Sequence, residues 1–284
     1  MHKKRNMFQG RKLIIATKHQ KEKIIAPILE QVIDVEALLV ENFDSDVFGT
    51  FSGEIKRIED ALSTARNKCN HALAISGHDL AIASEGSFGA HPSLFFSIAN
   101  EEIVLLVDKK NKCEFFERVI SFQTNSNAAS INSIEALKQF AKKAMFPSHG
   151  LILRKEKEDY SRVESVISSW KKLYRVYDSF IKEKDTVWVE TDMRAHVNPT
   201  RNEVIKQVVL KLADRLQNKC PKCDFPGFGH TKSVAGLPCQ LCSKPTQSIL
   251  YHQHSCSSCH HAVAFYYPNN KKREDPMYCD YCNP

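Results

Sequence analysis

The chain has 284 residues, of which 42% are hydrophobic and 26% charged, a composition that suits one sizeable globular domain with a smaller one attached. No apolar run approaches the roughly 18 residues of a membrane-spanning helix, and the short run at 13–16 does not fit a secretory signal, so we expect a cytoplasmic protein without membrane association. The formal net charge of +7 gathers in residues 1–23, where eight Lys and Arg face one Glu, so charge alone does not indicate a nucleic-acid-binding surface.

Strand and helix patterns alternate along residues 11–217. Strands are expected at 12–16, 35–40, 80–83, 103–107, 113–122, 149–153 and 186–190. Helices are expected at 21–32, 59–76, 133–145, 161–180 and 200–217, with a glycine-bearing turn at 48–54. Ser161 and Thr200, each followed three residues later by Glu, are expected to cap two of these helices, and Gly77 to end another. The pattern predicts an α/β domain at 11–217, a mixed sheet flanked by helices.

Polar residues gather where the first strand meets the first helix. This segment contains Thr17, His19, Lys21 and Lys23. In α/β sheets, ligands bind at the carboxyl ends of the strands, where helix N-termini present free amides. The hydroxyl and ammonium groups of this segment could hydrogen-bond to a phosphate there. A solvated helix start explains the segment equally well on its own.

A second polar segment follows the predicted strand 80–83. Glu85 stands there beside Gly86 and Gly89, so its carboxylate could hold Mg²⁺ while the glycines leave room for a ligand. Glu59 and Asp60, at the start of the preceding helix, are candidates to assist. The structural alternative is a plain turn with Glu85 in solvent.

The densest polar segment spans 190–201, between the last predicted strand and the last helix. Five polar residues with four kinds of side chain fall within ten positions there: Asp192, Arg194, His196, Asn198 and Arg201. Pro199 suits an early position of the helix that follows. We interpret the segment as part of a functional site, although an Asp–Arg pair that braces a loop is a fair alternative.

Eight of the ten cysteines form four Cys-x-x-Cys pairs. The pairs are Cys220/Cys223, Cys239/Cys242, Cys256/Cys259 and Cys279/Cys282. This spacing turns both sulfurs onto one metal, so we predict two structural zinc ions in a zinc-ribbon-like module at 218–284. Disulfides are disfavoured in a cytosolic chain, and an iron–sulfur cluster is less common with this spacing. Neighbouring pairs could share a zinc, or the first pair could join the third. The isolated Cys69 and Cys113 are expected to be small buried residues.

The run Thr-Asp-Met-Arg-Ala-His-Val-Asn-Pro-Thr-Arg at 191–201, with Cys-Pro-Lys-Cys at 220–223 and the final Tyr-Cys-Asn-Pro, resembles an uncharacterised bacterial family with a TDMRAHxNPTR-type motif and C-terminal zinc knuckles. That resemblance implies no activity. Four further segments, at 16–23, 65–69, 79–86 and 199–201, distantly resemble the inosine/xanthosine triphosphatases. This second resemblance implies hydrolysis of a nucleotide, with Glu85 and Arg201 as the residues that transfer most readily.

The leading hypothesis is therefore a Mg²⁺-dependent phosphohydrolase or pyrophosphatase that acts on a nucleotide-like substrate. Glu85 would hold the metal with Glu59 or Asp60, and Asp192 or His196 would act as general base. Phosphate and other substrate groups would be bound by Thr17, His19, Lys21, Lys23, Arg194, Asn198 and Arg201.

The alternative is a non-catalytic nucleotide or nucleic-acid-binding protein, or one whose tail contacts a protein partner or forms oligomers. Aromatic residues of the zinc module could stack on bases, although filling the small cores of two zinc ribbons is the more ordinary role. These residues are Phe225, Phe228, Tyr251, Phe265, Tyr266 and Tyr267.

Overall fold

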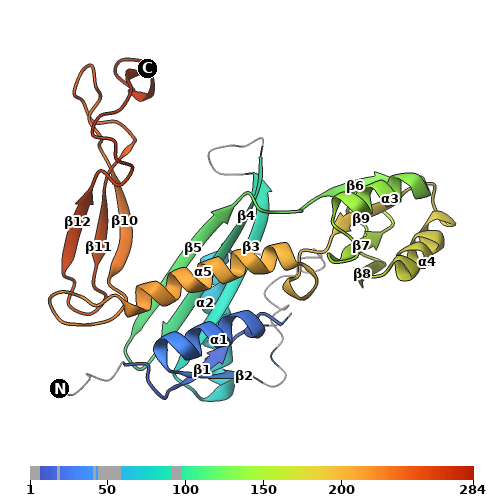
Figure 1. The fold of residues 1–284 in the computed structure, drawn as a ribbon, viewed down its shortest axis with the longest axis horizontal. Coiled ribbons are helices and arrows are strands. Elements are labelled where there is room, and N and C mark those ends of the chain that lie inside the picture. The colour runs from blue at the N-terminus through green and yellow to red at the C-terminus, as the bar shows by residue number, and fades with distance from the viewer. Residues whose placement is uncertain (1–6, 18–19, 41–42, 44–58, 91–96) are drawn as a thin grey trace. The chain divides into compact units, whose positions relative to one another are not determined.

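The computed structural model describes residues 7–17, 20–40, 43, 59–90 and 97–284. The chain divides into two compact units, Met1–Leu212 and Ala213–Pro284, and each is described by itself (Figure 1). Among the described residues, no helix is both long and apolar enough to cross a membrane.

Unit 1 is built first on a five-stranded mixed sheet with the strand order β2-β1-β3-β4-β5. Its strands are β1 (Lys12–Ile15), β2 (Glu36–Leu39), β3 (Leu80–Ala90), β4 (Ile98–Asp108) and β5 (Cys113–Ser121). Strand β1 runs parallel to β2 and β3, whereas β3, β4 and β5 pair antiparallel. The parallel pairing places the end of β1 beside Ile82, near the start of the longer β3.

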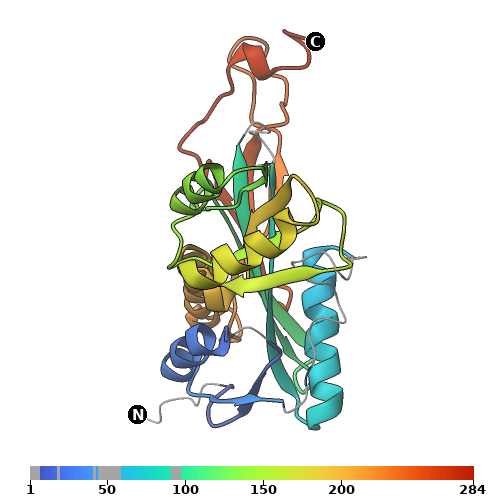
Figure 2. The same ribbon diagram turned by 90° about the vertical axis from the view of Figure 1, so that its right-hand side faces the viewer.

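Three helices cover this sheet. Helix α2 (Ala61–Ser76) lies on one face, while α1 (Glu22–Ile33) and α5 (Pro199–Gln217) lie on the other (Figures 1 and 2). Small side chains of α2, such as Ala65 and Ala72, pack on Ala81 and Ala83 of β3, which lets helix and sheet approach closely. The helix begins at an Asp60 cap and ends at Gly77, whose φ of 70° is the left-handed conformation that glycine adopts readily.

A second, four-stranded antiparallel sheet in unit 1 has the order β6-β9-β7-β8. Its strands are β6 (Ala128–Ile131), β7 (Leu151–Arg154), β8 (Val163–Ile167) and β9 (Val187–Thr191). Helices α3 (Ile134–Lys143) and α4 (Trp170–Ile181) pack against it through buried residues that include Leu137, Phe140, Leu173 and Phe180. The predicted class, a mixed α/β fold with helices flanking a mixed sheet, is confirmed, but the strands fall into two sheets.

Two predicted elements are wrong in detail. The strand predicted at 80–83 continues to Ala90 and forms a long hairpin with β4, so the polar segment that was expected beyond its end lies within the strand. The helix predicted at 161–180 is β8 followed by α4, which Ser169 caps by accepting a hydrogen bond from Lys172 N. The β-branched residues of 163–167 favour a strand paired with β7, and this pairing overrides the capping signal at Ser161.

The start of α5 also differs from the prediction. The helix begins at Pro199, one residue before the expected Thr200. The Asn198 side-chain oxygen accepts a hydrogen bond from Arg201 N at 3.0 Å, so Asn198 performs the capping that was expected of Thr200. The turn predicted at 48–54 lies outside the described residues.

Unit 2 contains a three-stranded antiparallel sheet in the order β10-β11-β12. Its strands are β10 (Gly229–Ala235), β11 (Ile249–Ser255) and β12 (Ala262–Tyr266), and a short 3-10 turn, η3 (Pro276–Tyr278), follows. The loops that join these strands carry the cysteines.

The core of the second sheet offers a direct test of the fold. Leu173 of α4 is fully buried, and we expect Leu173→Ala to lower the free energy of unfolding by about 2–5 kcal/mol through the cavity that it leaves. Leu39 of β2 is 55% exposed, and Leu39→Ala should change stability by no more than about 0.5 kcal/mol. The only two tryptophans, Trp170 and Trp188, lie in α4 and β9, so tryptophan fluorescence in a urea titration reports this sheet. Equal effects of the two substitutions would contradict the assigned core.

Candidate functional site

Buried charged side chains gather where β1 ends beside β3. Strand β1 stops pairing with β3 at Ile15, and the chain then leaves towards α1. Lys21, just before that helix, points its ammonium back to β3, where Nζ donates to the carbonyl oxygen and to Oγ of Ser84 at 3.0 and 3.1 Å. Lys21 is only 5% exposed. It therefore fills the gap that the end of β1 leaves beside β3.

The next residue of β3 carries an ion pair on the face that α2 covers. Glu85 is 2% exposed, and its Oε1 lies 2.5 Å from Nζ of Lys68, on α2. The packing of α2 on the sheet positions this lysine, which the sequence analysis did not single out. The carboxylate that was predicted to hold magnesium thus has a lysine as its close partner.

The opposite face of the same strands carries a second ion pair. Arg201, in the first turn of α5, donates from Nε to Oε1 of Glu102 at 2.6 Å and from Nη2 to Oε2 at 3.3 Å. Its Nη1 also donates to the carbonyl oxygen of Met193 at 2.6 Å. Both side chains of the pair are fully buried. Arg201 therefore connects the polar segment after β9 to the middle of β4.

Gly86 makes room for this second pair. It lies directly opposite Glu102 in the β3–β4 hairpin. A Cβ atom at this position would stand 2.5 Å from Nη2 of Arg201 and would overlap the Glu102 carboxylate. Only glycine leaves space for the guanidinium to reach the strand.

We call Lys21, Lys68, Glu85, Glu102 and Arg201 the charge cluster. It contains three cations and two carboxylates, and the hydrogen-bond acceptors of Lys21 are the neutral oxygens of Ser84. The pKa of Lys21 is lowered to about 7, chiefly by burial and then by the nearby Arg201, against the opposing effect of both carboxylates. The cluster thus holds one more cation than its carboxylates neutralise.

A buried amide lies on the same strand as Glu102. Asn100 of β4 is fully buried, and among the described residues neither its side-chain oxygen nor its nitrogen has a hydrogen-bond partner. It pairs across the hairpin with Phe88, whose ring lies 5.5 Å from the Arg201 guanidinium carbon. Residues two apart on a strand share a face, so Asn100 projects on the same side of the sheet as the Arg201–Glu102 pair. Such an unpaired amide normally indicates a bound water or ligand.

The structure brings some predicted site residues together and separates others. Lys21, Glu85 and Arg201 belong to the charge cluster, and Thr17 lies two residues after the end of β1. Lys23 is exposed and hydrogen-bonds to Gln20. His19 lies outside the described residues.

The two predicted helper carboxylates at the start of α2 have local partners. Asp60 caps the helix through Leu62 N and Ser63 N, and its other oxygen accepts a hydrogen bond from Ser63 Oγ. Glu59 accepts a hydrogen bond from Asn67 at 2.6 Å. These contacts are those of a helix start, and the proposed metal-binding role of both residues stays a prediction.

The remaining predicted residues brace the segment that leads into α5. Both oxygens of the fully buried Asp192 bind the Arg194 guanidinium, and they also accept from Arg194 N and Val166 N. Asn198 caps α5 and donates to Asn125 and to the Asp192 carbonyl. His196 is half-buried in the 3-10 turn η2 (Ala195–Val197), and burial lowers its pKa. The roles in chemistry that were predicted for these side chains stay predictions.

His149 is a further buried residue of this region that the sequence analysis did not select. Its Nε2 accepts a hydrogen bond from Thr200 N at 3.3 Å and lies 2.9 Å from Thr200 Oγ1. Its Nδ1 lies 3.0 Å from Ser148 Oγ. Burial lowers the pKa of His149, which favours the neutral ring that can accept from the first turn of α5.

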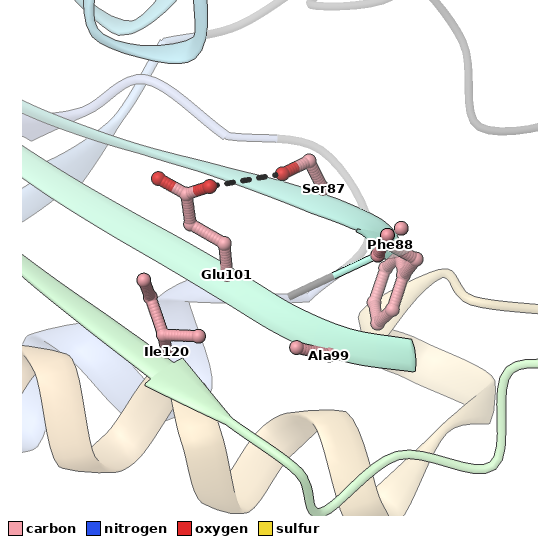
Figure 3. Close-up of a pocket in the computed structure, with 7 residues that line it drawn as sticks. Ser87, Phe88, Ala99, Glu101 and Ile120 are labelled. Carbon is pink, nitrogen blue, oxygen red and sulfur yellow. Dashed lines mark hydrogen bonds between the residues drawn. The ribbon is translucent and has the colours of Figure 1, made fainter. Parts of the chain in front are cut away.

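A small hollow lies farther along the hairpin (Figure 3). It is lined by residues 87–90 of β3, Ala99 and Glu101 of β4 and Ile120 of β5. Ser87 and Glu101 lie on one side of the strands and are joined by a 3.5 Å hydrogen bond, whereas the Phe88 ring points to the other side. The hollow is thus on the face opposite the Arg201–Glu102 pair.

The eight paired cysteines form two separate clusters in unit 2. The first contains Cys220, Cys223, Cys256 and Cys259, and the second contains Cys239, Cys242, Cys279 and Cys282. The first pair in the sequence therefore joins the third, and the second joins the fourth. Of the two pairings that the sequence left open, the structure has the interleaved one. Because β10 and β11 are antiparallel, the segment before β10, with the first cysteine pair, lies beside the segment after β11, with the third pair.

Each cluster has the dimensions of a zinc site. The sulfur–sulfur distances are 3.7 Å for Cys220–Cys259, 3.6 Å for Cys223–Cys256, 3.9 Å for Cys239–Cys282 and 3.6 Å for Cys242–Cys279. Zinc–sulfur bonds of about 2.3 Å in a tetrahedron place sulfurs about 3.8 Å apart, so both clusters fit the ion. Backbone amides already face the sulfurs, and those of Cys242 and Leu241 lower the pKa of the Cys239 thiol to about 7.

The fold and these clusters define a mixed α/β protein with two four-cysteine sites that could hold zinc. A family model described as "Domain of unknown function (DUF6671)" matches residues 68–284, well over half of the chain. The chain therefore belongs to this family, and the expectation of an uncharacterised family is confirmed. A comparison with curated proteins finds no match.

The interleaved pairing can be tested by counting zinc. Cys220→Ser with Cys256→Ser removes ligands from one cluster only, so this double variant should keep about one zinc ion per chain. Cys220→Ser with Cys239→Ser damages both clusters and should keep none. Zinc per chain, measured by elemental analysis after gel filtration, distinguishes the two. The reverse result would mean that neighbouring pairs share a zinc.

The Arg201–Glu102 pair can be tested through Gly86. Gly86→Ala forces the pair apart, and separation of a buried ion pair should lower the free energy of unfolding by about 3–5 kcal/mol. Gly89, on the same strand, is a matched control, because a Cβ there meets nothing within 4 Å. Chemical denaturation of both variants gives the comparison, and an equally stable Gly86→Ala protein would refute the proposed constraint.

Proposed function

We propose that unit 1 binds and hydrolyses a phosphorylated, nucleotide-like substrate at the charge cluster, and that unit 2 carries two structural zinc ions. The observation that carries the first part is the extra buried cation, Lys21. A buried charge is costly unless an opposite charge pairs with it. In the described part of the chain, the Lys21 ammonium donates to neutral oxygens, so an anion at the end of β1 would supply the missing partner.

The other members of the cluster support a phosphate more than a carboxylate. Lys68 and Arg201 approach Lys21 from opposite faces of the sheet, which gives three cations around one end of β1. A polyphosphate presents several charged oxygens and can accept hydrogen bonds from all three, whereas one carboxylate cannot. Asn100 adds an amide with a free donor and acceptor on the same face as Arg201.

Binding of magnesium in this proposal requires an exchange of ion pairs. Among the described residues, the groups of three or more Cys, His, Asp and Glu that are close enough to hold a metal are the two cysteine clusters. When phosphate oxygens take over Lys68, the carboxylate of Glu85 becomes available to a cation that arrives with the nucleotide. Bound there, Mg²⁺ would lower the pKa of its water and offset the phosphate charge.

The proposal is tested by incubating the full chain and Mg²⁺ with a panel of nucleoside triphosphates and measuring the release of phosphate or pyrophosphate. Lys21→Met should weaken nucleotide binding at least about tenfold, because it removes the buried cation. Lys23→Met is the matched control, since Lys23 lies two residues away and is exposed. Glu85→Gln should abolish turnover more than binding. A panel without binding or turnover, or equal effects of both lysine variants, would refute the proposed activity.

Nucleotide affinity should also depend on pH. The Lys21 pKa of about 7 means that its ammonium, the form that attracts phosphate, is lost as the pH rises through neutrality. The charged groups that act on Lys21 are Arg201, Glu85, Glu102 and Lys68. The dissociation constant, measured by calorimetry between about pH 6 and 8.5, should therefore rise with pH in the wild type. In Lys21→Met this dependence should disappear, and a persistent slope would assign the titration to another group.

A further inference from the structure

The two cysteine clusters share one backbone geometry but differ at their tips. In three of the Cys-x-x-Cys turns, the amide of the third residue donates to the first sulfur at 3.4 Å: Lys222 and Ser258 in the first cluster, and Leu241 in the second. The corresponding residue of the fourth turn is Tyr281. The third residues are thus polar in the first cluster and apolar or aromatic in the second.

Binding of zinc does not explain this difference. The first cluster forms the same four-sulfur arrangement with Lys222 and Ser258, so an apolar residue at this position is not needed for the metal. Nor do the apolar side chains fill a core, because Leu241 is 74% exposed and Tyr281 is 60% exposed. Large apolar side chains in contact with water that serve neither packing nor the metal indicate a binding surface.

Two further exposed residues extend this surface. Met277 and Tyr278, just before Cys279, are each 59% exposed. We call Leu241, Met277, Tyr278 and Tyr281 the apolar tip. Each of the four lies within two residues of a cysteine of the second cluster, and the sulfurs of that cluster lie within 4.8 Å of one another, so the four share one end of unit 2.

Lysine ammonium groups stand beside both rings of the apolar tip. Nζ of Lys244 lies 3.9 Å from the centroid of the Tyr281 ring, and Nζ of Lys271, which also pairs with Glu274, lies 6.0 Å from that of Tyr278. Lys272 and Arg273 are exposed next to them. Cations beside an exposed ring suit a partner that has flat apolar faces together with negative charge.

We propose that the apolar tip of unit 2 binds single-stranded nucleic acid. Bases would stack on Tyr278 and Tyr281, with Leu241 and Met277 as apolar flanks, and the backbone phosphates would lie against the neighbouring lysines. A protein partner is the less favoured occupant, because lysine is depleted at protein–protein interfaces. This surface belongs to unit 2 alone, so the proposal does not depend on hydrolysis at the charge cluster.

The test uses the zinc-loaded full chain and a fluorescein-labelled oligouridylate of about a dozen nucleotides, with binding followed by fluorescence anisotropy. The wild type should bind it, and affinity should fall steeply with added salt, as phosphate contacts require. Tyr281→Ser should weaken binding about tenfold, which corresponds to the loss of one stacked base. Leu241→Ser with Tyr281→Ser should weaken it further.

Two controls separate this surface from general effects. Ser258→Ala alters the equivalent position of the first cluster, and Tyr160→Ser removes an exposed tyrosine of unit 1 that also has a cation, Arg154, beside its ring. Neither should change affinity, and every variant should retain two zinc ions. The proposal is overturned if the wild type does not bind the oligonucleotide or if Tyr281→Ser binds as tightly as Tyr160→Ser. Absence of binding by the wild type would leave the tip to a protein partner.

Discussion

The bidentate ion pair between Arg201 and Glu102 joins parts of unit 1 that are distant in the sequence. It connects the first turn of α5 to the central hairpin of the five-stranded sheet, and through the Met193 carbonyl it also holds the segment after β9. Fully buried charges are tolerated only with close partners and good geometry. This geometry depends on two further residues. Gly86 has no side chain and so leaves space for the pair, and Asn198 fixes the start of the helix that carries Arg201.

The same region combines costly features that a purely structural core avoids. Within the described part of the chain, the buried Lys21 donates to neutral oxygens, and the buried Asn100 has an unpaired amide. Each lowers stability, and natural proteins keep such groups mainly where a ligand or a reaction uses them. The Lys68–Glu85 and Arg201–Glu102 pairs, by contrast, are satisfied internally. The region therefore combines two ion pairs that are satisfied within the protein with two groups, Lys21 and Asn100, that can still bind a ligand.

Much of unit 1 could be predicted from sequence because periodicity and end signals agree there. Gly77 ends α2 as expected, and Pro199 lies in the first turn of α5. The errors arise where a local signal competes with strand pairing. Ser161 looks like a helix cap, yet 163–167 pairs with β7, and the glycines after Ala83 look like a turn, yet Gly86 lies within a long strand opposite Glu102. Partners such as Lys68 and Glu102 could not be found, because the contacts that pair them are between residues distant in the sequence. The eight cysteines were visible from their spacing, but their pairing depends on the register of β10 and β11.

The interleaved cysteines make the C-terminal unit indivisible. A break in the chain anywhere between Cys242 and Cys256 would separate the cysteines of both clusters, whereas neighbouring pairs would have left two complete half-modules. During synthesis, the first cluster is incomplete until Cys259 has left the ribosome, by which point half of the second cluster has already been made. Gain or loss of this unit in evolution should therefore involve all of it together, since no shorter piece retains both clusters.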